Sequence, residues 1–209
     1  MLTGIHRYFP NTMIVGLIVL GLALVRVSWV LVGIGGLILT IALVGLQLLF
    51  PVVFGDAIKT IQTPGLMEAC AVSPIGSGGS YEMVPSYWFG ITTYFLSYIL
   101  SNAVSIYSKN PTKQPNTAIA VQQRKGLGII SIVAVSMIGL ILLIGRLISP
   151  CESWLGIGLG LTLGAGWGYL WWYILNAQGN DIFQDIHNVM VGLQPGDLRT
   201  GPVACKPAA

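Results

Sequence analysis

The chain has 209 residues, of which ten are lysine or arginine and seven are aspartate or glutamate, and its formal net charge is +3. Charged residues make up only 8% of it, and the mean hydropathy is +0.78. Soluble domains carry about 25% charged residues. The composition therefore excludes an ordinary soluble protein and predicts an all-α integral membrane protein.

The first long apolar stretch contains a single charged residue, Arg26. About 20 apolar residues suffice to cross a bilayer core of ~30 Å, so this stretch is too long for one span and long enough for two. The predicted spans are Pro10–Val25 and Trp29–Phe50, the second ended by Pro51. One long tilted helix is the alternative. The cost of an arginine at mid-bilayer favours a tight turn at Arg26.

Three further apolar stretches follow, at Pro85–Tyr107, Gly126–Ile148 and Trp154–Leu175. The sequence thus predicts about five transmembrane helices, or four if the first two are one long helix. Residues 1–175 would form the helical bundle, and residues 176–209 a polar C-terminal tail.

The distribution of positive charge predicts the orientation, because cytosolic loops carry an excess of lysine and arginine. The five-span map places the N-terminus and the loop at residues 55–84 on one side of the membrane. The loop Ser108–Lys125 and the C-terminus lie on the other. The second side holds seven of the ten basic residues: Arg26, Lys109, Lys113, Arg124, Lys125, Arg199 and Lys206. We therefore expect the C-terminus on the cytosolic side during insertion, and the loop at residues 55–84 on the non-cytosolic side.

Two of the three cysteines, Cys70 and Cys151, fall in the non-cytosolic loops, whereas Cys205 falls on the cytosolic side. A disulfide between Cys70 and Cys151 would be allowed in an oxidising compartment. The alternative is two unrelated free thiols.

Signals for catalysis are weak, because the two histidines, His6 and His187, lie on opposite sides of the predicted membrane. We find no zinc-protease, nucleophile-elbow or phosphate-loop motif and no nucleic-acid motif. The sequence thus predicts neither an enzyme nor a cofactor or metal site. The glycines Gly156, Gly160 and Gly164 recur every fourth residue within one span, a spacing typical of close helix packing.

The third span is the most polar. Thr93, Ser97 and Ser101 form one stripe, and an adjoining stripe holds Tyr94, Tyr98 and Ser105. Such a helix either faces water or a solute in a small transporter or channel, or forms hydrogen bonds to other helices. The second interpretation is favoured, because no acid or base lies at the centre of any span.

Aromatic residues lie near the ends of the predicted spans, where amphipathic rings favour the headgroup region. We therefore expect them to be interfacial anchors: Tyr87, Trp88, Phe89, Trp154, Trp171, Trp172 and Tyr173.

The tail contains an apolar stripe of helical period over Asp181–Leu193, which predicts an amphipathic helix. Interfacial helices usually carry lysine or arginine on the polar face, whereas this one carries Asp181 and Asp185. That difference favours contact with a protein. The expected partner-binding residues are those of the apolar stripe, with one from the extended segment that follows: Ile182, Phe183, Ile186, Met190 and Arg199.

The C-terminal part of the chain resembles multi-span membrane proteins of large icosahedral double-stranded DNA viruses of the chlorovirus kind. The residues that carry the resemblance are Trp171-Trp172-Tyr173, Gly179-Asn180-Asp181-Ile182-Phe183, Gly192-Leu193, Leu198-Arg199-Thr200-Gly201-Pro202 and Cys205. The resemblance implies a structural protein of a virion inner membrane whose tail and loops contact capsid or core proteins. Its partners would be the lipid bilayer and other membrane or capsid proteins, and the sequence leaves an oligomer open. The alternative is a small transporter or channel that uses the polar third span.

Overall fold

The computed structural model describes residues 2–54, 84–108, 118–148 and 153–177, and the regular secondary structure of this part of the chain is all helix. The helices are α1 (Leu2–Ala23), α2 (Val27–Phe54), α4 (Tyr87–Ser108), α5 (Ala118–Ile148) and α6 (Trp154–Ala177). The predicted all-α class is confirmed for the described residues. Three segments are long and apolar enough to cross a membrane: Val27–Phe54, Tyr87–Ser108 and Lys125–Ile148.

The other two helices are less apolar or shorter. The apolar part of α1, Tyr8–Ala23, is below the length of a typical span. Helix α6 is 24 residues long and carries no charged residue. Its many glycine, tryptophan and tyrosine residues keep its hydropathy below that of the three segments above.

A tight turn separates α1 from α2, so the first apolar stretch forms two helices, as the position of Arg26 predicts. The amide of Arg26 donates to the carbonyl of Gly21 (2.7 Å), and that of Val25 donates to Leu22 (3.2 Å). This pair of bonds is the Schellman motif, which normally has glycine at the left-handed position. Here Val25 occupies that position with a φ of 53°.

Several predicted boundaries were wrong. Helix α2 continues through Pro51 to Phe54, since a proline in the last turn removes only one hydrogen bond near the helix end. Helix α1 likewise begins at Leu2 and contains Pro10. Helix α5 begins at Ala118, within the predicted loop, because alanine and glutamine favour helix ahead of the apolar stretch. Its apolar segment, Lys125–Ile148, agrees with the predicted span.

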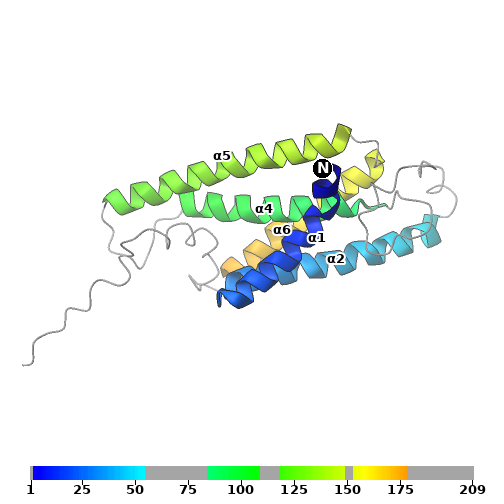
Figure 1. Cartoon of the computed structure of the whole chain (residues 1–209), viewed down its shortest axis with the longest axis horizontal. Helices are drawn as coiled ribbons and strands as arrows, with labels where there is room; N and C mark the ends of the chain where they lie inside the picture. Colours follow the sequence, from blue (N-terminus) through cyan, green and yellow to red (C-terminus); the bar gives the residue numbers. More distant parts are fainter. Residues whose placement is uncertain (1, 55–83, 109–117, 149–152, 178–209) are drawn as a thin grey trace, which may run out of the picture.

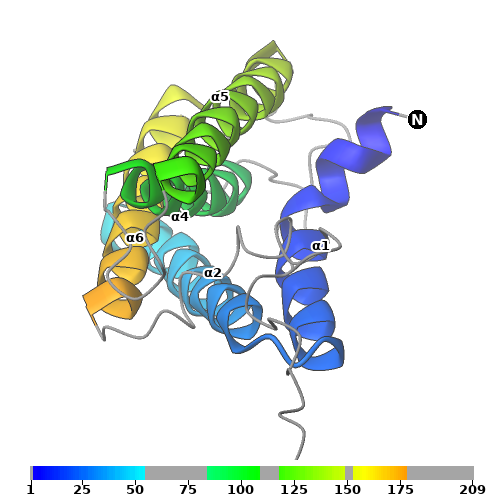
Figure 2. The ribbon, with the colours of Figure 1, turned by 90° about the vertical axis from the view of Figure 1, so that its left-hand side faces the viewer.

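Helix α4 is the centre of the bundle and contacts all four other helices. Figure 1 shows α4 beside α5 and α6, and the end-on view of Figure 2 shows α1 set apart from α5 and α6. Two thirds of the apolar window in α4 is buried, against 11% in α5. The most polar of the predicted spans is thus the innermost helix.

Successive helices alternate in direction between the two ends of the bundle. The contacts of Gly33 with Ile18 and of Gly21 with Val30 show that α1 and α2 are antiparallel. Gly139 of α5 meets Leu96 of α4, whereas Gly128 meets Tyr107, so these two helices are also antiparallel. Helix α6 runs parallel to α4. This alternation is the one that a five-span map requires.

The glycine stripe of α6 packs directly on α4, and the interpretation of its spacing as helix packing is confirmed. Gly156, Gly160, Gly164 and Gly168 are all buried. A Cβ atom at Gly160 would lie 2.7 Å from the carbonyl oxygen of Ser86. One at Gly164 would collide with the carbonyl oxygen of Gly90, four residues further along α4. Glycine therefore allows the two backbones to touch along several turns.

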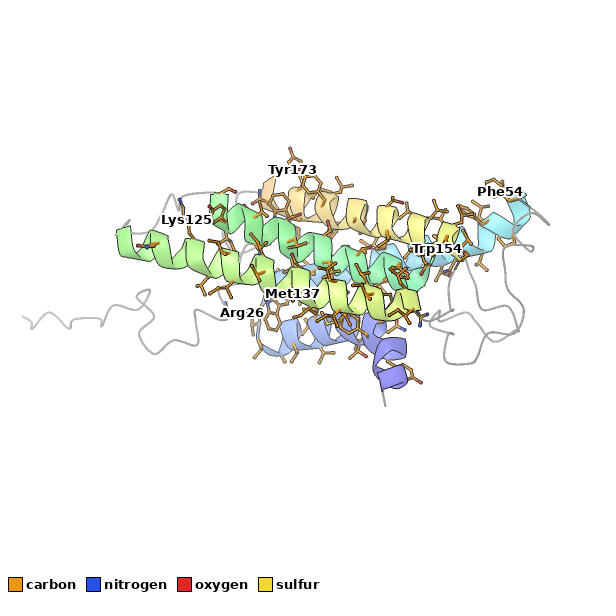
Figure 3. The ribbon with its side chains drawn as sticks, turned by 90° about the horizontal axis from the view of Figure 1, so that it is seen from above. Arg26, Phe54, Lys125, Met137, Trp154 and Tyr173 are labelled. Carbon is orange, nitrogen blue, oxygen red and sulfur yellow. The ribbon has the colours of Figure 1, made fainter. Side chains whose placement is uncertain are left out.

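The outer surface of the bundle is strongly apolar. Large side chains of α5 are exposed from Leu127 to Ile148, among them Ile130 (65%), Met137 (56%) and Ile141 (66%). Figure 3 shows such side chains around Met137. Soluble monomers rarely expose apolar patches of this extent. The surface is therefore suited to contact with lipid.

Candidate functional site

The partner-binding residues predicted from the sequence lie outside the described residues. They are Ile182, Phe183, Ile186, Met190 and Arg199. The proposed disulfide partners, Cys70 and Cys151, also lie outside them. What the described part of the chain offers is the buried surface of α4, on which the candidate site is built.

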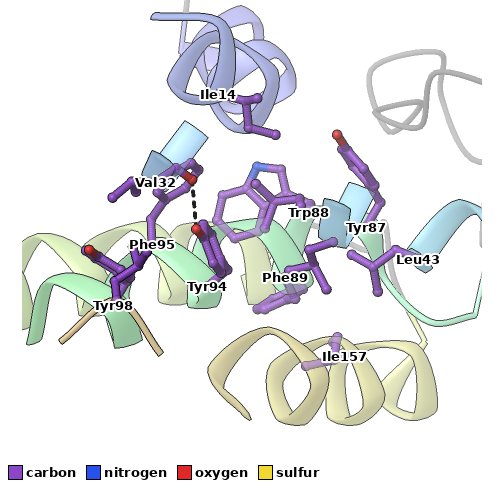
Figure 4. Packing of buried hydrophobic residues seen from close by; sticks show 13 residues of the cluster. Ile14, Val32, Leu43, Tyr87, Trp88, Phe89, Tyr94, Phe95, Tyr98 and Ile157 are labelled. Carbon is purple, nitrogen blue, oxygen red and sulfur yellow. Dashed lines mark hydrogen bonds between the residues drawn. The ribbon is translucent and has the colours of Figure 1, made fainter. Parts of the chain in front are cut away.

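The first turn of α4 is a buried aromatic cluster. Tyr87, Trp88 and Phe89 are 4%, 0% and 1% exposed, so the prediction that they anchor in the headgroup region was wrong. Figure 4 shows their rings between Ile14 of α1, Leu43 of α2 and Ile157 of α6. Hydropathy places such rings near a membrane end, but only packing decides whether they face lipid or the bundle. Trp154, at 81% exposure, does face outward as predicted.

A hydroxyl pair joins three helices at this cluster. The hydroxyl of Tyr87 donates to the side-chain oxygen of Asn11 in α1 (2.6 Å). It also lies 3.2 Å from the hydroxyl of Thr40 in α2. Thr40 in turn is 3.0 Å from the carbonyl of Gly36, within its own helix. The side-chain oxygen of Asn11 thereby finds its partner inside the bundle.

The polar stripes of α4 form hydrogen bonds to neighbouring helices. Tyr94 donates to the carbonyl of Val32 in α2 (2.7 Å), as Figure 4 shows. Ser97 donates to the carbonyl of Ala165 in α6 (2.8 Å). Thr93 donates to Phe89 within α4 (2.6 Å). The bonds of Tyr94 and Ser97 join α4 to other helices and are those that the packing interpretation of the third span predicts.

Two tryptophans of α6 bind the backbone of α2. The indole of Trp167 donates to the carbonyl of Gly35, and that of Trp171 to the carbonyl of Leu31, each at 3.0 Å. The two donors are four residues apart in α6, and the two acceptors are four residues apart in α2. Two successive turns of α6 are therefore bonded to two successive turns of α2. Gly35 is needed here, since a Cβ would collide with the Tyr94 hydroxyl and with Trp171. The prediction of Trp171 as an interfacial anchor was wrong. The sequence around a tryptophan does not show which distant backbone carbonyl its indole N–H will bind.

The opposite end of the bundle is held by capping groups. The hydroxyl of Ser86 accepts the amide of Phe89 (3.2 Å), which caps α4. The amide of Ser86 donates to the carbonyl of Gly156 (2.9 Å), so α4 and α6 begin side by side. Gln47 of α2 donates to the carbonyl of Pro85 (2.8 Å). Three helices are thus joined at one end by buried polar contacts.

One buried cation lies at the same end. Arg146 in the last turn of α5 is only 4% exposed, and its guanidinium carbon lies 5.7 Å from the ring centroid of Trp88. A cation over a tryptophan face is attracted by the ring quadrupole, more strongly in a desolvated place. Arg146 thereby attaches α5 to the aromatic cluster.

The chemistry of this site is that of helix association. No group of three histidine, cysteine, aspartate or glutamate residues that could hold a metal lies within the described ranges. All seven acidic residues of the chain fall outside those ranges. The described polar groups on α4 are mainly hydroxyls and amides, and those detailed above bind helix carbonyls and other side chains.

Comparisons with protein-family models, with curated proteins and with solved structures found no match for this chain. The argument about function therefore rests on the residues and their geometry.

Proposed function

We propose that the chain is a structural membrane protein that crosses its membrane five times and holds neighbouring proteins through its tail and its long non-cytosolic loop. By the resemblance of its C-terminal part, the membrane is the inner membrane of a virion and the partners are capsid or core proteins. The proposed partner-binding residues are Ile182, Phe183, Ile186, Met190 and Arg199.

The observation that carries this proposal is the use of the polar groups on α4. Tyr87, Tyr94 and Ser97 are bonded to α1, α2 and α6. The polar side chains of α4 are thus used to bind neighbouring helices. This favours a rigid anchor over a transporter, because side chains that line a solute path would need to be free of such bonds. A rigid bundle leaves the tail and the loop at residues 55–84 as the parts that bind other proteins.

Five crossings are supported by helix direction. Helix α6 lies along α4, which is apolar enough to span, so α6 would cross wherever α4 does. Helix α1 lies antiparallel along α2 in the same way. With five crossings the N-terminus and the tail would lie on opposite sides, and the basic residues favour the cytosolic side for the tail.

The experiment that tests the proposal changes the apolar stripe of the tail. Replacing Phe183 and Ile186 together by aspartate removes two side chains worth about 1.5–3 kcal/mol each when fully buried. We expect the double variant to insert normally and to be lost from the native assembly upon gentle membrane solubilisation and fractionation.

A matched control adds the same charge to the polar face of the same predicted helix, through Gln184→Asp and Asn188→Asp. The control should stay in the assembly. If both double variants assemble like the unchanged protein, the tail is not the docking element and the structural proposal loses its main support.

One observation favours the transporter alternative. The hydroxyl of Thr92 in α4 is buried and has no hydrogen-bond partner among the described residues. An unpaired buried hydroxyl is a place where a passing water or solute would find a partner. Solute flux into liposomes that Thr92→Val abolishes would support transport, whereas flux equal to protein-free liposomes would support the structural role.

A further inference from the structure

An apolar groove of about 320 Å³ opens between α2 and α6. It is lined by residues between Ile38 and Leu46 of α2 and between Thr162 and Leu170 of α6, and we refer to it as the α2–α6 groove. Its volume lies in the range of ~300–1,000 Å³ that is usual for sites that bind small molecules. The groove lies at half the height of both helices.

The groove is closed at one end and has a solid floor. The bonds from Trp167 and Trp171 to the carbonyls of α2 hold the two helices together at the closed end. The floor includes Leu43, which is fully buried and packs against Gly90 of α4. The groove therefore has a packed floor and one end fixed by hydrogen bonds, and it is open to the side.

The lining offers an occupant no charge and no free side-chain hydrogen-bond donor. Thr162 donates its hydroxyl to the carbonyl of Gly158 (2.9 Å), and the indole N–H of Trp167 is used by Gly35. Water needs two to four polar partners, so it would not fill this space. An empty space would lose the dispersion contacts of its whole lining. Hydrocarbon is the occupant that restores those contacts.

We infer that the α2–α6 groove binds one acyl chain of a phospholipid from the surrounding bilayer. The rim is continuous with the lipid-facing surface, since Ile38, Leu163 and Leu170 are 40%, 38% and 45% exposed. A chain can thus enter sideways from the membrane. This inference is independent of what the tail binds.

The length of the helix fits a chain from one leaflet. Trp154 is highly exposed at the start of α6, where a tryptophan favours the headgroup region. Figure 3 shows Trp154 and Phe54 toward the same end of the bundle. Trp167 follows Trp154 by ~20 Å along the helix, and half of a bilayer core is ~15 Å. A chain anchored beside Trp154 that extends ~15 Å would therefore place its tip beside Thr162 and Leu163, in the nearer half of the groove.

A second copy of the chain fits the groove less well. The groove is about two helical turns long, or ~12 Å, and a helix with side chains is ~10 Å wide. Stable protein interfaces bury ~1,200–2,000 Å², far more than a groove of this length provides. A flexible chain of methylene groups fills such a space without a larger interface.

Photolabelling of the full chain tests the inference directly. The protein is placed in phosphatidylcholine vesicles that contain a phosphatidylcholine with a diazirine in the middle of one acyl chain, and labelled residues are found by mass spectrometry. We expect labelling of the groove residues to exceed that of the exposed α5 face around Met137 by about tenfold, which corresponds to ~1.4 kcal/mol of preference for the groove.

Two glycines of α6 provide a matched pair of variants. A Cβ at Gly166 or at Gly158 meets nothing within 4 Å, but only Gly166 lines the groove. Gly166→Leu should lower groove labelling about tenfold, because a leucine displaces several methylene groups. Gly158→Leu should leave it unchanged. Ala42→Leu fills the groove from α2 and replaces Gly166→Leu if that variant does not fold.

Equal labelling of the groove and of α5 would overturn the inference, since it would mean ordinary lipid contact only. Groove labelling that neither filling variant reduces would also overturn it. A dimer of the unchanged protein that Gly166→Leu converts to monomer, seen by native mass spectrometry, would assign the groove to a second copy.

Discussion

The contact between α6 and α4 makes a sharp prediction for Gly164→Ala. A Cβ at this position would collide with the carbonyl oxygen of Gly90 and with the hydroxyl of Thr93. The Gly90 oxygen belongs to the backbone of the first turn of α4 and cannot rotate away as a side chain can, so α6 must move outward. The same movement breaks the close approach of Gly160 and Gly168 to α4.

The size of the effect follows from two opposing terms. Overpacking a close contact costs about 1–3 kcal/mol, and the backbone oxygen places this case at the upper end. Replacing glycine by alanine within a helix raises the free energy of unfolding by up to about 1 kcal/mol. The net loss in the free energy of unfolding is therefore about 2 kcal/mol, or roughly a thirtyfold change in the folding equilibrium.

Gly158→Ala is the matched control, because a Cβ at Gly158 meets nothing within 4 Å. This variant keeps the helix-propensity term and lacks the collision, so it should be neutral or slightly stabilising. Both are measured by titration with sodium dodecyl sulfate in mixed micelles, followed by circular dichroism. Equal unfolding midpoints for Gly164→Ala and Gly158→Ala would refute the proposed packing of α6 on α4.

Three further predictions follow from particular residues. Val25→Gly should raise the free energy of unfolding by about 1 kcal/mol in the same titration, because a β-branched residue holds the left-handed position of the turn while its side chain is 84% exposed; a lower midpoint would contradict this. Tyr94→Phe should lower the free energy of unfolding by about 1 kcal/mol, because the hydrogen bond to α2 is lost. Tyr173→Phe changes a side chain that is 55% exposed and should have no effect. Equal effects of the two variants would be evidence against the bond. Single cysteines at Lys59 and at Lys113, with the native cysteines replaced by serine, should react with an impermeant maleimide from opposite sides of the membrane, and reaction of both from one side would refute the five-span map.

The sequence predicts the helices well because their length and lack of charge follow from the thickness of a bilayer. The turn at Arg26 and the glycine stripe of α6 could also be predicted, since each depends on local chemistry. Boundaries were less accurate where helix continues past a proline, as at Pro51, or into a polar segment, as at Ala118.

The order of the helices in space could not be predicted in this way. Hydropathy does not distinguish a side chain that faces lipid from one that faces another helix, so Trp88 and Trp171 were taken for interfacial anchors. Their burial and bonds depend on residues far away in sequence, such as Arg146 and Leu31. The α2–α6 groove likewise arises from two helices that touch at the tryptophans and leave a gap beyond them.

The most direct test of the central claim, that the tail holds a partner protein, is site-specific photocrosslinking in the native membrane or particle. A photoreactive amino acid is placed at Phe183, on the apolar stripe, and separately at Asp185, on the polar face. We predict that the probe at Phe183 forms a discrete crosslink to a second protein and that the probe at Asp185 does not. Crosslinks from Phe183 to lipid alone would contradict the account, because they would mean that the helix lies in the membrane interface.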